Sequence, residues 1–186
     1  MSQNYKAIML GISNVGKTSI INAFRPLNDI IEPTVRYDLY QFSCSIDGNE
    51  FTIGLWDIPG QTQYRPMTQT FLRNVDVALI VYDITSEDSF DNVNEDYKLL
   101  IQETPNPHVF IIGNKVDLES ERRVFATVGE NYANQIGAKF FEVSALHNTN
   151  IVELFDALKL AASGIDKPIT ESINLSNTKE KKKGCC

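Results

Sequence analysis

The sequence predicts an α/β fold in which helices cover both faces of an open, mostly parallel β-sheet. Three observations lead to this prediction. Short apolar runs typical of buried strands alternate with segments whose apolar residues recur at helical spacing. Two of the strand-like runs flank Asp47-Gly48-Asn49, a turn signal that predicts one antiparallel hairpin. The first strand-like run leads through a glycine-containing loop into a helix, as in a strand–loop–helix unit.

The expected elements follow one another from the N-terminus. The first strand and helix span residues 7–10 and 19–24, and the hairpin strands span 37–46 and 50–56. Three further strands are near-continuous apolar runs, which predicts burial on both faces: 75–82, 109–113 and 139–143. Helical segments separate or follow them: 89–103, 127–136 and 151–162. Because crossovers are right-handed, the loops after the strands should meet at one edge, where ligands bind.

Composition and charge limit the class of protein. With 186 residues, 42% of them apolar, the chain is long enough for one domain with a substantial core. The net charge of −7 argues against nucleic acid as a partner, because that binding needs a basic face. Cys44, Cys185 and Cys186 make no disulfide framework, and no apolar run reaches the roughly 18 residues of a membrane span. Without a secretory signal pattern, we expect a protein made in the cytosol.

Residues 11–18 match the phosphate-binding pattern G-x-x-x-x-G-K-[ST]. Backbone N–H groups of such a loop, together with the positive end of the helix that follows, bind an anion. Lys17 can reach the outer phosphates, and the Thr18 hydroxyl is placed to ligate Mg2+. The alternative is an ordinary glycine turn, which the strand–loop–helix context disfavours. The residues expected to bind phosphate are Ser13, Asn14, Val15, Gly16, Lys17, Thr18 and Ser19.

A second group of candidate residues follows the third strand. Asp57 ends that strand, where a carboxylate that reaches Mg2+ through water is expected. Gly60 can offer its N–H to a terminal phosphate, and Gln61 has a donor and an acceptor with which to hold an attacking water. A solvated loop side chain is the alternative for Gln61, and its spacing from Asp57 favours the catalytic interpretation. The catalytic candidates are therefore Lys17, Gly60 and Gln61.

A third group of candidates has the chemistry to select a base. Asn114-Lys115-Val116-Asp117 follows a strand, and Ser144-Ala145-Leu146 closes the next one. The Asp117 carboxylate can accept hydrogen bonds from guanine N1–H and from its exocyclic amine, a pair that adenine cannot supply. The Lys115 stem can lie along the flat base, and a backbone N–H after the later strand can meet O6.

In their order and spacing, these motifs resemble those of the Ras-like small GTPases. The matching stretches are residues 11–18, Glu32-Pro33-Thr34, residues 56–61, residues 114–117 and Ser144-Ala145. The terminal Cys185-Cys186 after a lysine-rich segment is similar to the Rab family, whose members carry two geranylgeranyl groups there. The resemblance implies a P-loop NTPase G domain over residues 1–164, followed by a flexible tail over 165–186. That domain has three α/β/α layers and a six-stranded, mostly parallel sheet with one antiparallel edge strand.

The resemblance also implies a function. The protein would be a GTP/GDP-switched regulator of vesicle traffic that binds and hydrolyses GTP with Mg2+. Thr34 would add its hydroxyl to Mg2+ only while the terminal phosphate is present, and Gln61 would position the water. The implied partners are an exchange factor, a GTPase-activating protein, a Rab escort protein or GDP dissociation inhibitor, and effectors. The protein would be a monomer on the cytosolic face of intracellular membranes.

Several residues depart from the family pattern. Asn14 stands where glycine is usual, and asparagine tolerates positive φ better than most residues, so we expect the loop to keep its form. Pro59 has no N–H and a fixed φ, which predicts a stiffer second switch and an effect on hydrolysis rather than on binding. Arg36 should change which effectors dock. Residues 25–30 lack the usual aromatic against guanine, and with Leu27 in its place we expect faster nucleotide release.

The tail has the composition of a membrane anchor. Four lysines and one glutamate closely precede Cys185 and Cys186. Two lipid chains, or one chain plus basic charge, give stable membrane residence, whereas one chain alone is marginal. The end does not match C-a-a-X, so a Rab-type route is implied by the resemblance. The alternative is a disordered charged end with two incidental cysteines.

Two other functions compete with the switch. The first is a GTP-binding adaptor attached to a membrane that hydrolyses little, with Pro59 and Asn14 freezing the cycle. The second is a P-loop kinase, which would need a second substrate site and lid arginines. Residues 114–117 already account for base selection, which disfavours the kinase.

Overall fold

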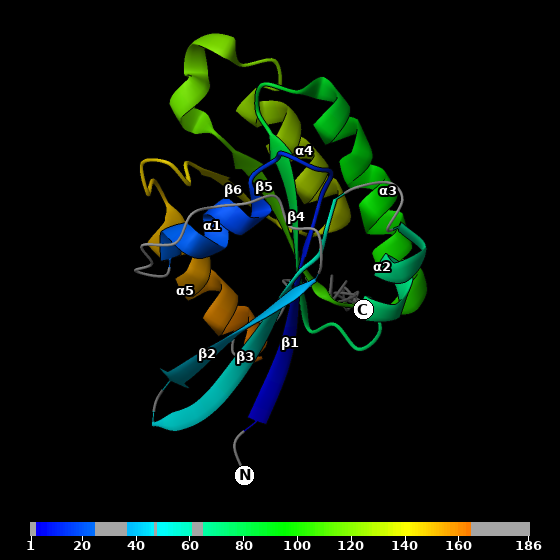
Figure 1. Cartoon of the computed structure of the whole chain (residues 1–186), viewed down its shortest axis with the longest axis vertical. Helices are drawn as coiled ribbons and strands as arrows, with labels where there is room; N and C mark the ends of the chain where they lie inside the picture. The colour runs from blue at the N-terminus through cyan, green and yellow to red at the C-terminus, as the bar shows by residue number, and fades with distance from the viewer. Residues whose placement is uncertain (1–2, 25–36, 47, 61–64, 165–186) are drawn as a thin grey trace, which may run out of the picture.

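The computed structural model describes residues 3–24, 37–46, 48–60 and 65–164 (Figure 1). Its six-stranded sheet has the order β2-β3-β1-β4-β5-β6. The strands are β1 (Gln3–Leu10), β2 (Asp38–Ile46), β3 (Asn49–Asp57), β4 (Val77–Asp83), β5 (His108–Asn114) and β6 (Lys139–Val143). The helices are α1 (Lys17–Phe24), α2 (Arg65–Phe71), α3 (Glu87–Glu103), α4 (Ala126–Ile136) and α5 (Ile151–Ala162), with a 3-10 helix at Val116–Glu121. β2 pairs with β3 antiparallel and the other pairings are parallel, so the predicted α/β fold is confirmed.

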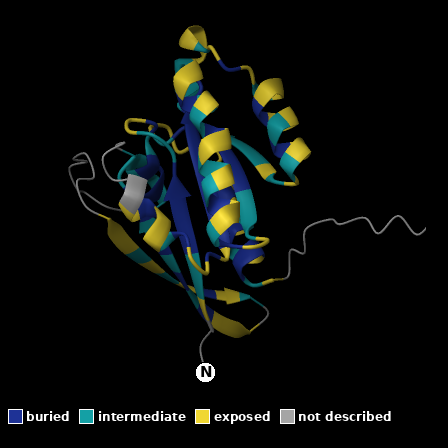
Figure 2. Ribbon diagram, turned by 90° about the vertical axis from the view of Figure 1, so that its right-hand side faces the viewer, coloured by how far each residue is buried: buried dark blue, intermediate teal, exposed yellow. Residues whose placement is uncertain are grey.

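Two hydrophobic cores hold the layers together, one on each face of the sheet. Ala7 and Met9 of β1 point into the core that α1 and α5 cover, whereas Ile8 and Leu10 point into the core beneath α3 and α4. Figure 1 shows these two sets of helices on opposite sides of the strands, and Figure 2 shows buried strands behind helices with exposed outer faces. Full burial of one such side chain stabilises the fold by about 1.5–3 kcal/mol, so these cores fix the sheet that carries the loops.

The carboxyl ends of the strands meet at one edge of the sheet. The strand order changes direction at β1, which has β3 on one side and β4 on the other. The register sets Met9 opposite Asp57, and it sets Asp83 and Val143 on either side of Asn114. The loop after β1 therefore lies at the topological switch point, where open α/β sheets bind ligands.

Three features differ from what the sequence pattern predicts. β1 begins before residue 7, because residues 3–6 pair with β3 beyond the stretch that also pairs with β4. The pattern does not predict α2 or the 3-10 helix, since both are too short to show a clear period. The expectation that β6 is buried on both faces is wrong: Lys139 is exposed and the next three residues are half-buried, because β6 is an edge strand.

The hairpin expected from the Asp-Gly turn is confirmed. β2 and β3 pair along their whole length, with Ile46 opposite Asn49. β5 begins at His108, as the apolar run after it predicts. In the part of the chain that the structure describes, no helix has both the length and the apolar character needed to cross a membrane.

Candidate functional site

The loop between β1 and α1 has the backbone form that phosphate binding requires. Asn14 and Gly16 have φ of 68° and 92°, in the left-handed region. The expectation that Asn14 can replace a glycine here is confirmed, because asparagine takes this conformation readily. A Cβ on Gly16 would lie 2.3 Å from Nδ2 of Asn114, so this position has no room for another residue. The loop is thereby held close to β5.

Lys17 begins α1 and turns its ammonium back across the loop. Its Nζ donates to the carbonyl oxygens of Gly11 at 2.8 Å and Ile12 at 3.0 Å, and the residue is only 7% exposed. Burial lowers the pKa of Lys17 below the usual lysine value, and Asp57 and Asp96 act against that shift. A cation held here beside the backbone of the loop suits an anion in front of the loop.

The chemistry for a divalent cation lies beside this lysine. The Thr18 hydroxyl donates to Oδ2 of Asp57, which ends β3 and is fully buried. Hydroxyl and carboxylate oxygens are the donors that Mg2+ prefers, so this pair fits the predicted ion. Within the described residues, no three His, Cys, Asp or Glu side chains group closely enough to hold a metal.

Gly60 lies directly against the phosphate loop. A Cβ at this position would sit 2.2 Å from the carbonyl carbon of Ile12 and 2.5 Å from the Gly11 oxygen. The contact is with backbone, which cannot move aside cheaply, so glycine is required. Pro59 precedes it and is half-buried. Gln61 and Thr34 lie outside the described residues, as do Leu27, Arg36, Cys185 and Cys186.

The Asn114 side chain joins the phosphate loop to the predicted base site. Its Nδ2 donates to the Val15 carbonyl at 2.9 Å, and its Oδ1 accepts from the Ala145 backbone N–H at 3.2 Å. The Ser144 hydroxyl donates to Oδ1 of Asp117 at 2.5 Å. Segments separated in sequence are thus brought to one corner of the sheet edge. Asn114 is 2% exposed, so the arrangement is shielded from water.

Lys115 has a pairing that the sequence pattern does not predict. Its φ is 71°, and its Nζ lies 2.6 Å from Oδ2 of Asp83 at the end of β4. The other carboxylate oxygen accepts from the Thr85 N–H and hydroxyl, both at 2.8 Å. Burial acts to raise the pKa of Asp83, but the hydrogen bonds from Lys115 and Thr85 outweigh it and leave the pKa below the usual value. The ion pair therefore fixes the lysine whose stem was predicted to lie along a base.

The remaining predicted site residues lie in the phosphate loop, in α1 and after β6, with different exposure. Leu146 is 74% exposed beside Ala145, so its side chain is free to cover a flat ligand. Ser13 is exposed on the phosphate loop and Ser19 is half-buried in α1. Val15 is 1% exposed and packs in the core, so only its backbone can face a ligand.

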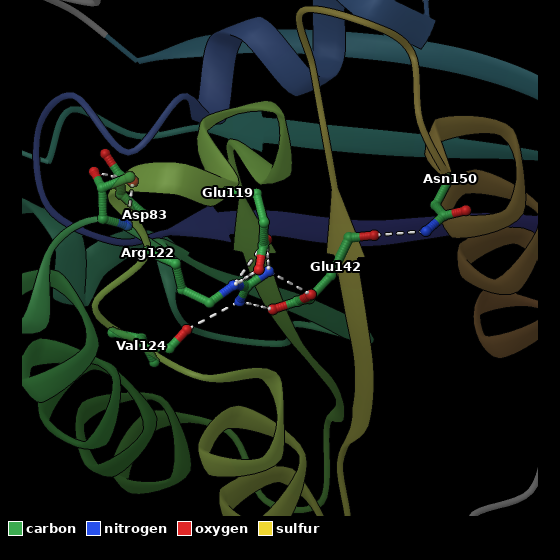
Figure 3. Close-up of polar contacts among 7 residues, drawn as sticks. Asp83, Glu119, Arg122, Val124, Glu142 and Asn150 are labelled. Atoms are coloured by element: carbon green, nitrogen blue, oxygen red, sulfur yellow. Dashed lines mark hydrogen bonds and ion pairs between the residues drawn. The ribbon is translucent and has the colours of Figure 1, made fainter.

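Sequence reasoning missed a second charged group near the base corner. Arg122 makes ion pairs with Glu119 of the 3-10 helix and Glu142 of β6 (Figure 3). An acid at the end of a buried strand was the available signal for Asp83, as it was for Asp57. Arg122 and Glu142 carry no such local signal, because their pairing depends on how β5 and β6 align.

Comparison with known proteins agrees with this geometry. The model of the Ras family matches residues 6–163. The chain is 32% identical to Ras-related protein RabC of Dictyostelium discoideum, over 98% of this chain and 97% of that protein. It is 36% identical to Ras-related protein Rab-21 of Homo sapiens, over 82% of this chain and 69% of that protein. It is 32% identical to Ras-related protein Rab-7a of Paramecium octaurelia, over 99% of this chain and 97% of that protein. The chain therefore belongs to the Ras family, as a divergent, Rab-like member of these small GTP hydrolases.

Proposed function

We propose that this protein is a switch that alternates between GTP and GDP and regulates intracellular vesicle traffic. One observation supports the proposal most strongly: the Asn114 side chain bonds both the Val15 carbonyl and the Ala145 N–H. A loop suited to phosphate and a corner suited to a base are thereby held at the two ends of one site. Guanosine triphosphate has a charged triphosphate at one end and a flat guanine base at the other.

The phosphate end would be bound chiefly by the loop. Backbone N–H groups of residues 13–19 and the Lys17 ammonium would neutralise the phosphate oxygens. Mg2+ would be held by the hydroxyls of Thr18 and Thr34 and, through water, by Asp57. When bound, Mg2+ draws charge from the transferring phosphate. Gly60 lies against the loop at Gly11 and Ile12, and its N–H would donate to the terminal phosphate.

The base end would be selected by Asp117 and Ala145. The carboxylate would accept the guanine N1–H and amine, while the Ala145 N–H would be shared between O6 and Oδ1 of Asn114. The Lys115 stem and the exposed Leu146 would cover the two faces of the ring. Adenine presents the opposite donors and acceptors at these positions, so ATP would leave buried polar groups unpaired.

Hydrolysis would use water as the nucleophile. Gln61 would hold the water in line, the bond from the γ-phosphorus to the bridging oxygen would break, and GDP and inorganic phosphate would form. Lys17 and Gly60 would stabilise the charge that develops on the phosphate oxygens. Thr34 would lose its place when the γ-phosphate leaves, which gives the switch its two states.

The cellular role is proposed from membership of the Rab-like branch. Residues 1–164 would form the nucleotide-binding domain, monomeric in solution, and residues 165–186 a tail that carries prenyl groups on Cys185 and Cys186. Two chains give stable attachment to the cytosolic face of a membrane. An exchange factor and a GTPase-activating protein would drive the cycle, effectors would bind the GTP state, and an escort protein or GDP dissociation inhibitor would carry the lipidated form.

A second candidate function is a GTP-binding adaptor that hydrolyses little. Pro59 supports it, because this residue has no N–H and precedes the tightly seated Gly60. Asn14 does not support it, since its φ of 68° keeps the form of the loop.

Titration calorimetry at millimolar Mg2+, on protein stripped of nucleotide, tests nucleotide choice. We expect GDP to bind at least about a hundredfold tighter than ADP. Equal binding of the two, or binding of neither, would contradict the proposal. Single-turnover GTP hydrolysis then compares the natural protein with Gln61→Leu, and with Gln102→Leu on the exposed face of α3 as the matched control. Loss of hydrolysis in the first variant alone supports the switch, and equal slow rates in all three favour the adaptor.

A further inference from the structure

The guanidinium of Arg122 is fully engaged by two carboxylates and one carbonyl. Nε and Nη2 donate to Glu119 at 2.7–2.9 Å, and Nη1 and Nη2 donate to Glu142 at 2.6 and 3.0 Å. Nη1 also donates to the Val124 carbonyl at 3.0 Å. All five N–H groups of an arginine are thereby used, as Figure 3 shows. We call Glu119, Arg122 and Glu142 the arginine clamp.

The clamp joins two segments that flank the predicted base site. Glu119 belongs to the 3-10 segment Val116–Glu121, which also contains Asp117 and is kinked at Leu118 between the two. Glu142 belongs to β6, which ends just before Ser144. The Glu142 carbonyl also accepts from the Asn150 side chain at 2.8 Å, which ties β6 to the start of α5. A chain of contacts therefore runs from the segment that carries Asp117 to β6, the strand that precedes Ser144 and Ala145.

Apolar packing holds the 3-10 helix only in part, through Val116, which lies partly buried against the core beneath α3 and α4. None of its residues, Val116–Glu121, is buried. The pairing of Arg122 with Glu142 is shielded, since their side chains are 10% and 19% exposed, whereas Glu119 is 67% exposed. Shielded charge pairs are screened less by solvent and salt than exposed ones. The Glu142 arm is therefore the stronger of the two.

We propose that Arg122 is a positioning residue for guanine recognition. By holding the 3-10 helix against β6, the clamp sets the spacing between the Asp117 carboxylate and the Ala145 N–H. These are the two groups that read opposite sides of the base edge, so this inference rests on the proposed function. The guanidinium of Arg122 is engaged by Glu119, Val124 and Glu142, so Arg122 would act on the base only through them. Its effect should appear in the choice between bases rather than in phosphate binding.

The test compares the affinities of the full-length protein for GDP and IDP by competition titration at millimolar Mg2+. Inosine lacks the exocyclic amine, so IDP uses only one of the two hydrogen bonds to Asp117. In Arg122→Met we expect GDP affinity to fall about tenfold or more and IDP affinity to fall less, so that the GDP-to-IDP ratio shrinks at least about threefold. Glu142→Gln should follow this pattern, and Glu119→Gln should show a smaller effect.

Two further variants separate positioning from general stability. Arg122→Lys keeps the charge but cannot bridge two carboxylates with a planar fork, so it should restore the ratio only in part. Arg73 is 75% exposed and its Nε lies 3.6 Å from Oε2 of Glu103. Arg73→Met removes this exposed ion pair and should leave the GDP-to-IDP affinity ratio unchanged. Thermal unfolding of each variant reports whether it is folded.

The outcomes are distinct. Equal loss of GDP and IDP affinity in Arg122→Met would make the arginine a structural residue only and would overturn the inference. If that variant does not fold, Glu119→Gln and Arg122→Lys decide, and an unchanged ratio in both overturns it. If the natural protein does not prefer GDP over IDP, the proposed base selection by Asp117 fails first, and the clamp loses its role with it.

Discussion

Substitution of Asn114 by alanine tests whether the phosphate loop and the base corner depend on each other. Alanine at this position removes the donor to the Val15 carbonyl at 2.9 Å and the acceptor for the Ala145 N–H at 3.2 Å. Asn114 is 2% exposed and lies close against Gly16, so the site gives little room for water to replace the lost amide. The Val15 carbonyl and the Ala145 N–H would be left without this hydrogen-bond partner.

The size of the effect follows from these two groups. A polar group left unpaired on burial costs about 1–3 kcal/mol, so Asn114→Ala should lower the free energy of unfolding by about 2–6 kcal/mol. Domains of this kind are stable by about 5–15 kcal/mol. We therefore expect the variant to fold, with a much smaller margin. The nucleotide should also stabilise it less than it stabilises the natural protein, because both ends of the site lose their common support.

Urea unfolding followed by circular dichroism, with and without saturating GDP, measures both effects. The slope of free energy against urea should stay the same, so that the midpoint alone reports stability. Asn131→Ala, at an exposed position on α4, is the matched control and should change the free energy by less than about 0.5 kcal/mol. A loss below about 0.5 kcal/mol in Asn114→Ala, or an undiminished stabilisation by GDP, would refute the reasoning.

Three further predictions address single contacts. Asp83→Asn should lower the free energy of unfolding at neutral pH, since it removes the charge that pairs with Lys115. The pKa of Asp83 is lowered in the folded protein, so the stabilisation from this charge is full above the unfolded-state pKa. It is lost as the pH falls through the folded-state pKa. Urea curves of the two proteins should therefore converge in acid, and a difference that persists would contradict the ion pair. Gly60→Ala places a methyl group 2.2 Å from the Ile12 carbonyl carbon, so calorimetry should show weaker binding of a non-hydrolysable GTP analogue, by about 1–3 kcal/mol, with less effect on GDP. Leu146→Ser should change the unfolding free energy by less than about 0.5 kcal/mol because the side chain is 74% exposed, yet reduce GDP affinity severalfold; equal affinity would show that the leucine does not cover the base.

The sequence was sufficient for the order of the strands and the longer helices, and for the groups that follow the strands. β5 is a buried apolar run, so its end at Asn114 could be located closely, and the hairpin partner strand led to Asp57 at the end of β3. The short helix α2 could not be predicted, because seven residues show no clear period. Nor could the edge position of β6 be predicted, since strand order depends on crossovers and not on the composition of one strand.

The pairing of charged side chains around the base corner was also beyond the sequence. Arg122 contacts Glu142 across 20 residues, and several other acids lie closer to it along the chain. Only the alignment of β5 with β6, which sets Asn114 opposite Val143, decides which carboxylate faces the guanidinium. A local sequence pattern therefore identifies residues whose place at the end of a strand puts them in the site. It misses residues whose contacts depend on how two strands align.

The two ends of the site are built from different interactions, which allows their coupling to be measured. Gly60 is in close backbone contact at the proposed phosphate end and Leu146 is exposed at the proposed base end, whereas Asn114 bonds to both loops. Gly60→Ala and Leu146→Ser should therefore weaken binding of a GTP analogue additively, within about 0.5 kcal/mol. Each of them combined with Asn114→Ala should cost less than the sum, because the asparagine variant already displaces the loop on which the second change acts. Strict additivity in all three pairs would mean that Asn114 supports each loop separately and does not couple them.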